Sequence, residues 1–227
     1  MNGRLIVLEG LDGSGKATQA ARAVRRLEES GQAVRAISFP DYNSESSALV
    51  KMYLRGEVGA LDEVNVYAAS GFYSLDRYIS YEREWKADYQ AGKTIIADRY
   101  TTSNLCHQMV KLPRGQWMDY IRWLEYYEYM LLALPKPDLV LYLDMHPAAS
   151  QRLMEQRYNG DEAKKDLHER NRAYLEACRE AALFAAGTLG WVVLPCSDAA
   201  HNPYPVEEIE TAAFSEISRC LAAAKQY

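Results

Sequence analysis

The feature that most constrains this chain is a glycine-rich segment near its start, between an apolar run and a helix-like pattern. Residues 5–8 are apolar and too few for a helix, whereas the residues after Lys16 have helical spacing. Residues 10–15 and Lys16 match the phosphate-binding loop pattern in its strand, turn and helix context. Glycines let successive backbone N–H groups face one anion, and the helix start adds positive potential. The segment therefore predicts a site for nucleotide phosphates.

One position of this loop departs from the usual pattern. The residue after the lysine is normally Ser or Thr, whose hydroxyl binds Mg²⁺, but here it is Ala17. Thr18 follows, but it leaves the loop in a different direction. The alternative interpretation is a glycine-rich turn that carries a lysine by chance. The nucleotide-binding residues predicted from the loop are Gly10, Leu11, Asp12, Gly13, Ser14, Gly15, Lys16, Ala17 and Thr18.

Composition limits the class of protein. The chain has 227 residues and 48% hydrophobic content, which suits one domain over residues 1–227 with one sizeable core. A net charge of −5 argues against a nucleic-acid-binding surface. The cysteines are widely spaced, as in a reduced cytosolic protein, and neither they nor the histidines have zinc-ligand spacing. We find no apolar run that would span a bilayer and no signal peptide, so we expect a cytoplasmic protein without a membrane partner.

Short apolar segments alternate with helical patterns along the chain. Strands are predicted at residues 5–8, 33–39, 94–97, 139–143 and 191–195. Helices are predicted at residues 16–29, 44–56, 65–90, 101–111, 117–134 and 148–186, the last broken near 158–161, and from residue 205 onward. This alternation indicates an α/β fold with a five-stranded parallel sheet and helices on both faces. Because ligands bind at the carboxyl ends of such strands, the loop, residues 39–42 and residues 98–99 should converge on one crevice.

The ordered motifs GLDGSGKATQ, FPDY, FYSLDR, DRYTTSN and LPKPDLVLYLD resemble those of the thymidylate kinase family over nearly the whole chain. The loop alone is widespread, whereas the ordered set is specific. The resemblance implies a P-loop NTPase fold of the nucleoside monophosphate kinase type, with a lid at about residues 150–168. It also implies a homodimer that phosphorylates dTMP to dTDP with ATP and Mg²⁺, in dTTP synthesis.

The resemblance assigns charged residues to the two phosphate sites. Asp12 would approach the 3′-hydroxyl of the acceptor, unless it only caps its own turn. Arg99 follows a buried strand, where an unpaired guanidinium is costly, and would bind the acceptor phosphate. The alternative for Arg99 is a salt bridge with Asp98 or another carboxylate. Asp98 would hold Mg²⁺ through a water molecule, or else orient Arg99 or Lys16.

The resemblance also predicts a site for the acceptor base. Tyr73 would stack on thymine. Arg77 lies on the same helix face and would donate a hydrogen bond to the O4 atom of the base. The alternative for this pair is an aromatic residue in the core and an arginine in solvent. Ser103 and Asn104 would read the base edge. His107 stands where some relatives place a tyrosine against the deoxyribose, and a surface histidine is the alternative. The remaining expected contacts at the rim are Phe39, Pro40, Tyr42 and Gln108.

Lid arginines are the last expected contributors. Some members of the family place a catalytic arginine in the loop, at the position of Gly13 here. Arg152 and Arg157 fit the other class, in which the lid supplies this charge. A solvated charged helix is the alternative interpretation. The expected catalytic set is therefore Lys16, Arg99, Asp12, Arg157 and Arg152.

Two other functions fit parts of the sequence. A deoxynucleoside kinase would need a carboxylate base beside the 5′-hydroxyl, for which Asp41 or Glu9 could be argued. Arg77 and Arg99 suit an acceptor that already bears a phosphate. A nucleotide-dependent switch without transferase activity is supported only by Ala17, because weak Mg²⁺ binding would slow chemistry.

Overall fold

The protein has a five-stranded parallel sheet at its centre, as the sequence predicted. The computed structural model describes residues 2–60, 63–158 and 172–223, with only the backbone of residues 154–158 and 172. The strands are β1 (Leu5–Glu9), β2 (Val34–Ser38), β3 (Thr94–Asp98), β4 (Leu139–Asp144) and β5 (Val192–Pro195). They lie in the order β2-β3-β1-β4-β5, and all four neighbouring pairs are parallel.

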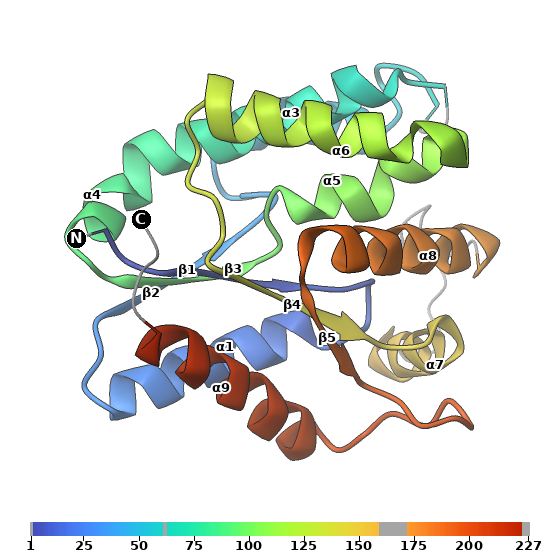
Figure 1. The fold of residues 1–227 in the computed structure, drawn as a ribbon. Coiled ribbons are helices and arrows are strands. Elements are labelled where there is room, and N and C mark those ends of the chain that lie inside the picture. Colours follow the sequence, from blue (N-terminus) through green and yellow to red (C-terminus); the bar gives the residue numbers. More distant parts are fainter. Residues whose placement is uncertain (1, 61–62, 159–171, 224–227) are drawn as a thin grey trace.

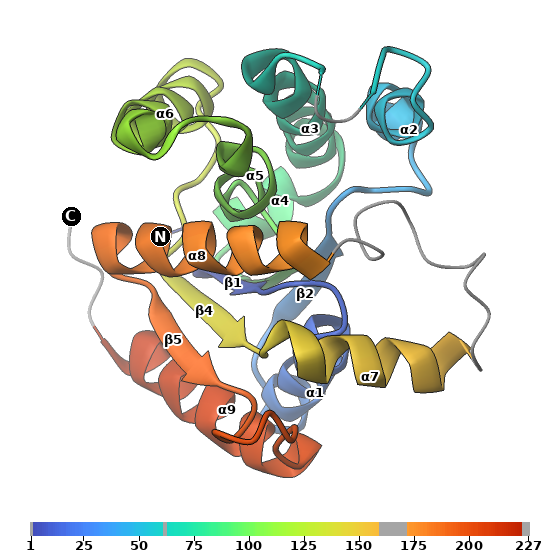
Figure 2. The ribbon, with the colours of Figure 1, turned by 90° about the vertical axis from the view of Figure 1, so that its right-hand side faces the viewer.

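Helices cover both faces of this sheet (Figures 1 and 2). The described helices are α1 (Lys16–Glu29), α2 (Ala48–Leu54), α3 (Val66–Ser80), α4 (Lys86–Gln90), α5 (Thr102–His107), α6 (Trp117–Glu125), α7 (Pro147–Tyr158), α8 (Arg172–Leu189) and α9 (Val206–Ala222). Both views place α1 and α9 on one face and α3, α5, α6 and α8 on the other. None of these described helices is long and apolar enough to cross a membrane.

The core follows the alternation of side chains along the strands. Ile6 and Leu8 of β1 pack in one cluster with apolar residues of α1 and α9, such as Leu27 and Ile217. The intervening residue Val7 faces the other side, where a second cluster holds a group of aromatic residues. The members of that aromatic group are Phe39, Tyr81, Trp85, Tyr89 and Tyr100. Both faces of β1 are therefore buried, which explains its uninterrupted apolar sequence.

Several predicted helices are interrupted. The segment predicted at 65–90 is α3 and α4 joined by a π-helical turn at Tyr81–Trp85, and α6 continues into a second π-helical turn at Tyr126–Leu131. Short 3₁₀ turns at Glu45–Ser47, Met109–Lys111 and Arg114–Gln116 flank α2, α5 and α6. The segment predicted at 148–186 divides into α7 and α8, and residues 159–168 of the expected lid lie outside the described residues.

Candidate functional site

The loop after β1 is tightly turned against its neighbours. A Cβ atom on Gly10 would lie 2.9 Å from the carbonyl oxygen of Leu143 and 2.6 Å from Oγ of Ser14. Gly13 and Gly15 have φ angles of 77° and 89°, in the left-handed region that side chains disfavour. These positions therefore require glycine, and the loop ends at the N-terminus of α1, where backbone N–H groups favour an anion.

Lys16 is folded back over this loop. Its ammonium Nζ donates a hydrogen bond of 2.9 Å to the carbonyl oxygen of Leu11 and lies 4.0 Å from Oδ1 of Asp12. Burial and the charge of Arg99 lower the pKa of Lys16, and the nearby carboxylates only partly offset them. A phosphate at the loop would relieve this unfavourable burial of positive charge.

Two buried oxygens beside the loop lack a partner among the described residues, Oδ1 of Asp98 and Oγ of Ser14. Buried polar atoms are rarely unpaired in proteins, so these atoms fit a bound ion, water or phosphate. Burial raises the pKa of Asp98, against the opposing charges of Lys16 and Arg99. Ala17 and Thr18 are exposed. The arrangement thus fits a Mg²⁺ ion that Asp98 would hold through water, without a ligand from Ala17.

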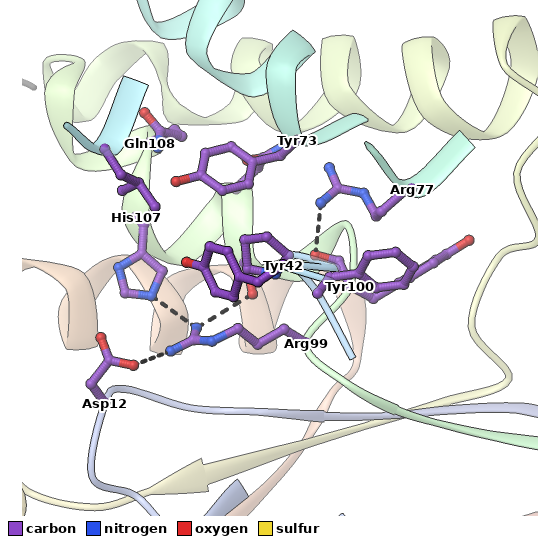
Figure 3. Close-up of a pocket in the computed structure, with 13 residues that line it drawn as sticks. Asp12, Tyr42, Tyr73, Arg77, Arg99, Tyr100, His107 and Gln108 are labelled. Carbon is purple, nitrogen blue, oxygen red and sulfur yellow. Dashed lines mark hydrogen bonds and ion pairs between the residues drawn. The ribbon is translucent and has the colours of Figure 1, made fainter. Parts of the chain in front are cut away.

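A pocket that is open to solvent lies next to the loop (Figure 3). The lining residues are Asp12, Phe39, Pro40, Tyr42, Leu54, Tyr73, Arg77, Arg99, Tyr100, Ser103, Asn104, His107 and Gln108. The structure therefore brings together every acceptor-side residue that the sequence indicated. Sequence reasoning missed Leu54 and Tyr100; the position of Tyr100 directly after Arg99 was the available signal.

Arg99 occupies the part of the pocket nearest the loop. Its backbone φ is 67°, a conformation that costs a non-glycine residue free energy and often marks functional sites. Its guanidinium forms an ion pair with Asp12, lies 3.3 Å from Oε1 of Glu9 and lies 3.1 Å from Nε2 of His107. Of the alternative partners considered for Arg99, it therefore pairs with other carboxylates, Asp12 and Glu9, and not with Asp98.

Opposite charges near Arg99 and Asp12 stabilise the ionised forms of both side chains. Burial alone would lower the pKa of Arg99, but Asp12 and Glu9 raise it above its usual range. Burial would raise the pKa of Asp12, but Arg99 and Lys16 lower it well below its usual range. Both groups are therefore charged near neutral pH.

Glu9 pairs with Arg99 and is itself held by several hydrogen-bond donors. Its carboxylate is fully buried and accepts hydrogen bonds of 2.7 Å from the hydroxyls of Thr102 and Ser103 and of 3.0 Å from the N–H of Gly10. A carboxylate surrounded by donors in this way is poorly placed to act as a general base. The hydroxyl of Ser103, expected to read a base edge, donates to Glu9 in this structure and also lines the pocket.

Tyr73 and Arg77 lie at the opposite end of the pocket from Asp12. Figure 3 shows the ring of Tyr73 across the pocket from the guanidinium of Arg99. Burial raises the pKa of Tyr73, so its hydroxyl stays neutral. Arg77 is only 1% exposed and forms a buried ion pair with Glu128, with 2.9 Å between Nε and Oε2. The alternative of a solvated arginine is therefore wrong.

His107 and Gln108 follow on α5. The ring of His107 stacks on that of Tyr174, with 6.5 Å between centroids, and Nδ1 lies 3.8 Å from Sγ of Cys178. The side chain is half-buried, so the alternative of a surface histidine is wrong. Gln108 is buried, and its Oε1 accepts a hydrogen bond of 3.4 Å from the hydroxyl of Tyr53.

Of the two expected lid arginines, the structure describes the side chain of Arg152, which does not line this pocket. Arg152 lies exposed on α7, and its guanidinium donates to the carbonyl oxygen of His201. The side chain of Arg157 lies outside the described residues. The catalytic role expected for these arginines therefore stays a prediction.

Comparisons of the sequence and of the fold with known proteins all find thymidylate kinases. The sequence model of a family described as thymidylate kinase matches residues 8–195. A thymidylate kinase of Caenorhabditis elegans is 36% identical over 160 residues, 66% of this chain and 67% of the relative. One of Arabidopsis thaliana is 32% identical over 210 residues, 92% of this chain and 68% of the relative. A solved thymidylate kinase structure from Candida albicans has the same fold, with a TM-score of 0.70, 20% identity, and coverage of 99% of this chain and 96% of that one.

Proposed function

The chain belongs to the thymidylate kinase family, and from this premise we propose how its residues carry out the family's reaction. It is a phosphotransferase that converts dTMP to dTDP. The phosphate donor would be ATP bound with Mg²⁺. The chain would form a single domain over residues 1–227, with a lid at about residues 150–168, in a cytoplasmic protein. A homodimer is also proposed, and exposed apolar side chains on α3 and after α6 support it. These side chains are Tyr67, Leu75, Tyr78, Tyr126, Met130 and Leu131.

The observation that carries the proposal is the arrangement of the pocket, which has charged residues beside the loop and an aromatic end away from it. Arg99 would bind the acceptor phosphate, and Asp12 would orient the 3′-hydroxyl. Tyr73 would stack on thymine. Ser103, Asn104 and Arg77 would face the base edge and His107 the deoxyribose, with Phe39, Pro40, Tyr42 and Gln108 as walls.

The donor would bind to the loop. Lys16 and the backbone N–H groups of residues 10–18 would contact its phosphates, and Asp98 would hold Mg²⁺ through water. The metal neutralises charge on the transferred phosphoryl group when it is bound. Lys16, Arg99 and the lid arginines Arg152 and Arg157 would add positive charge. Catalysis would therefore consist of positioning and charge neutralisation, without a covalent intermediate.

The first test is an ADP-release assay with ATP, Mg²⁺ and one acceptor at a time. The acceptors are dTMP, dUMP, dCMP, UMP and thymidine. We expect turnover with dTMP, because the cationic end of the pocket suits a monophosphate and the aromatic end suits a base. Turnover with dTMP well above that with the other acceptors would support the thymidylate assignment. Turnover with thymidine but not dTMP would instead indicate a nucleoside kinase. ATP binding without turnover of any acceptor would indicate a switch.

The missing loop hydroxyl leads to a separate prediction. Position 17 is exposed, so an added hydroxyl would fit without a clash. We expect Ala17→Ser to lower the Mg²⁺ concentration for half-maximal activity by about tenfold, the scale on which a change at a metal site alters affinity. A Mg²⁺ titration at fixed ATP and dTMP measures this. Ala21→Ser, on the exposed face of α1, is the matched control. An unchanged Mg²⁺ requirement in Ala17→Ser would contradict the proposed metal position.

A further inference from the structure

The base end of the pocket is backed by one carboxylate to which the proposed function gives no role. Glu128 lies in the π-helical turn after α6 and is 0% exposed. Its oxygens accept hydrogen bonds from Ser74 Oγ at 2.8 Å, from Arg77 Nε at 2.9 Å and from Asn104 Nδ2 at 3.4 Å, and also from Nη2 of Arg77. A buried carboxylate is costly unless donors satisfy it, and these donors come from α3 and α5, both of which contribute to the pocket.

The contacts of Arg77 limit what it can offer a ligand. Nε and Nη2 face Glu128, and Nη2 also lies 3.4 Å from Oγ of Ser74. Nη1 lies 3.4 Å from the carbonyl oxygen of Tyr100, as Figure 3 shows. A guanidinium has five N–H groups and no acceptor. Contacts with the described residues engage four of the five, which leaves one N–H of Nη1 for the pocket. Burial would lower the pKa of Arg77, but Glu128 raises it, so this group remains a donor.

Glu128 also acts on the amide of Asn104. The Nδ2 group lies 3.4 Å from Oε1 of Glu128 and 3.4 Å from the carbonyl oxygen of Ser70. Both of these oxygens only accept hydrogen bonds, so the NH₂ group of the amide must face them and the carbonyl group must face away. The carbonyl Oδ1 is then the atom of Asn104 left for a ligand, and it only accepts.

The result is a fixed donor on Arg77 and a fixed acceptor on Asn104, both lining one pocket. A pyrimidine with a carbonyl at C4 and a hydrogen on N3, such as thymine, complements this pair. Cytosine carries an amino group at C4 and an acceptor at N3, so it would place donor against donor and acceptor against acceptor. The pair therefore selects between these bases by hydrogen-bond polarity.

We propose that Glu128 is a positioning residue that sets the base specificity of the pocket by holding the guanidinium of Arg77 and the amide of Asn104 in one orientation. This inference rests on the proposed function, since it assigns the base to this end of the pocket. Glu128 acts only through Arg77 and Asn104.

The test is Glu128→Gln, which keeps the shape but replaces one acceptor oxygen with a donor. A glutamine amide cannot accept from all the surrounding donors, so Arg77 or Asn104 must reorient. We expect the ratio of kcat/KM for dTMP to that for dCMP to fall by about 10- to 100-fold, the scale for a hydrogen bond to a charged group. The loss should appear mainly as a higher KM for dTMP, with the KM for ATP unchanged. Comparing two acceptors on one preparation cancels any change in the folded fraction.

Two further variants complete the test. Glu125→Gln changes a partly exposed carboxylate that pairs with Lys136, one turn earlier on the helix, and should leave the ratio unchanged. Glu128→Asp retains a group that only accepts, and should retain most of the discrimination. An unchanged ratio in Glu128→Gln, or an equal loss in Glu128→Asp, would overturn the proposal. A wild-type protein without preference for dTMP over dCMP would overturn the proposed function together with this inference.

Discussion

Lys16→Met is expected to lower kcat/KM for dTMP phosphorylation by on the order of a thousandfold, the upper range for removal of one preorganised charge contact. The ammonium lies over the loop, within 4.0 Å of Oδ1 of Asp12, where the donor phosphates are proposed to bind. Methionine has a similar length and no charge, so it removes the electrostatic contact while it fills most of the same space. Steady-state kinetics with ATP and dTMP varied separately measure the loss.

The stability of the protein should not fall with this change. The pKa of Lys16 is lowered in the folded protein, which means that folding disfavours its charged form. Methionine therefore removes an unfavourable buried charge, and we expect thermal unfolding at or above the wild-type temperature. Lys86→Met, at an exposed lysine that pairs with Glu82 on the surface, is the control. A loss of activity below tenfold in Lys16→Met would contradict the proposed role.

Arg99→Ala is expected to lower kcat/KM by more than about a hundredfold. Its guanidinium lies beside Asp12 and His107 in the part of the pocket proposed for the acceptor phosphate. The strained backbone at this residue, with φ at 67°, supports a role in positioning. We expect the KM for dTMP to rise and kcat to fall, because the same charge would bind the acceptor and stabilise the transferred group. Kinetics with dTMP as the varied substrate check both parameters.

This substitution also leaves Glu9 without its cation, so reduced stability could by itself lower activity. Arg99→Lys separates the two effects, because lysine retains the charge but not the planar set of donors. We expect Arg99→Lys to unfold near the wild-type temperature and still lose activity. Arg35→Ala, at an arginine that pairs with Asp88 away from the pocket, should leave kcat/KM unchanged. A tenfold loss or less in Arg99→Ala would contradict its proposed role.

Local sequence was sufficient to predict the loop, and the ordered motifs predicted every residue that lines the pocket except Leu54 and Tyr100. Gly10 is required by close contacts with Ser14 of the loop and with Leu143 of β4. Lys16 follows the loop at a fixed spacing, so the sequence pattern predicted both residues. The apolar segments predicted a parallel sheet, and the carboxyl ends of its strands meet at one edge. This is why residues as distant as Asp12 and Arg99 could be assigned to one pocket before the strand order was known.

Tertiary structure decided how the charges are paired. Arg99 pairs with Asp12 and Glu9, and Arg77 pairs with Glu128. These partners are far apart in the sequence, so local sequence patterns could not predict the pairing. Glu128 lies in a segment whose sequence predicted a regular aromatic helix, so no role was predicted for this residue. A π-helical turn changes the angular position of its side chains, so helical periodicity did not predict that this carboxylate faces the interior. Local backbone chemistry is encoded in adjacent residues, whereas the partner of a buried charge depends on which elements the completed fold brings together.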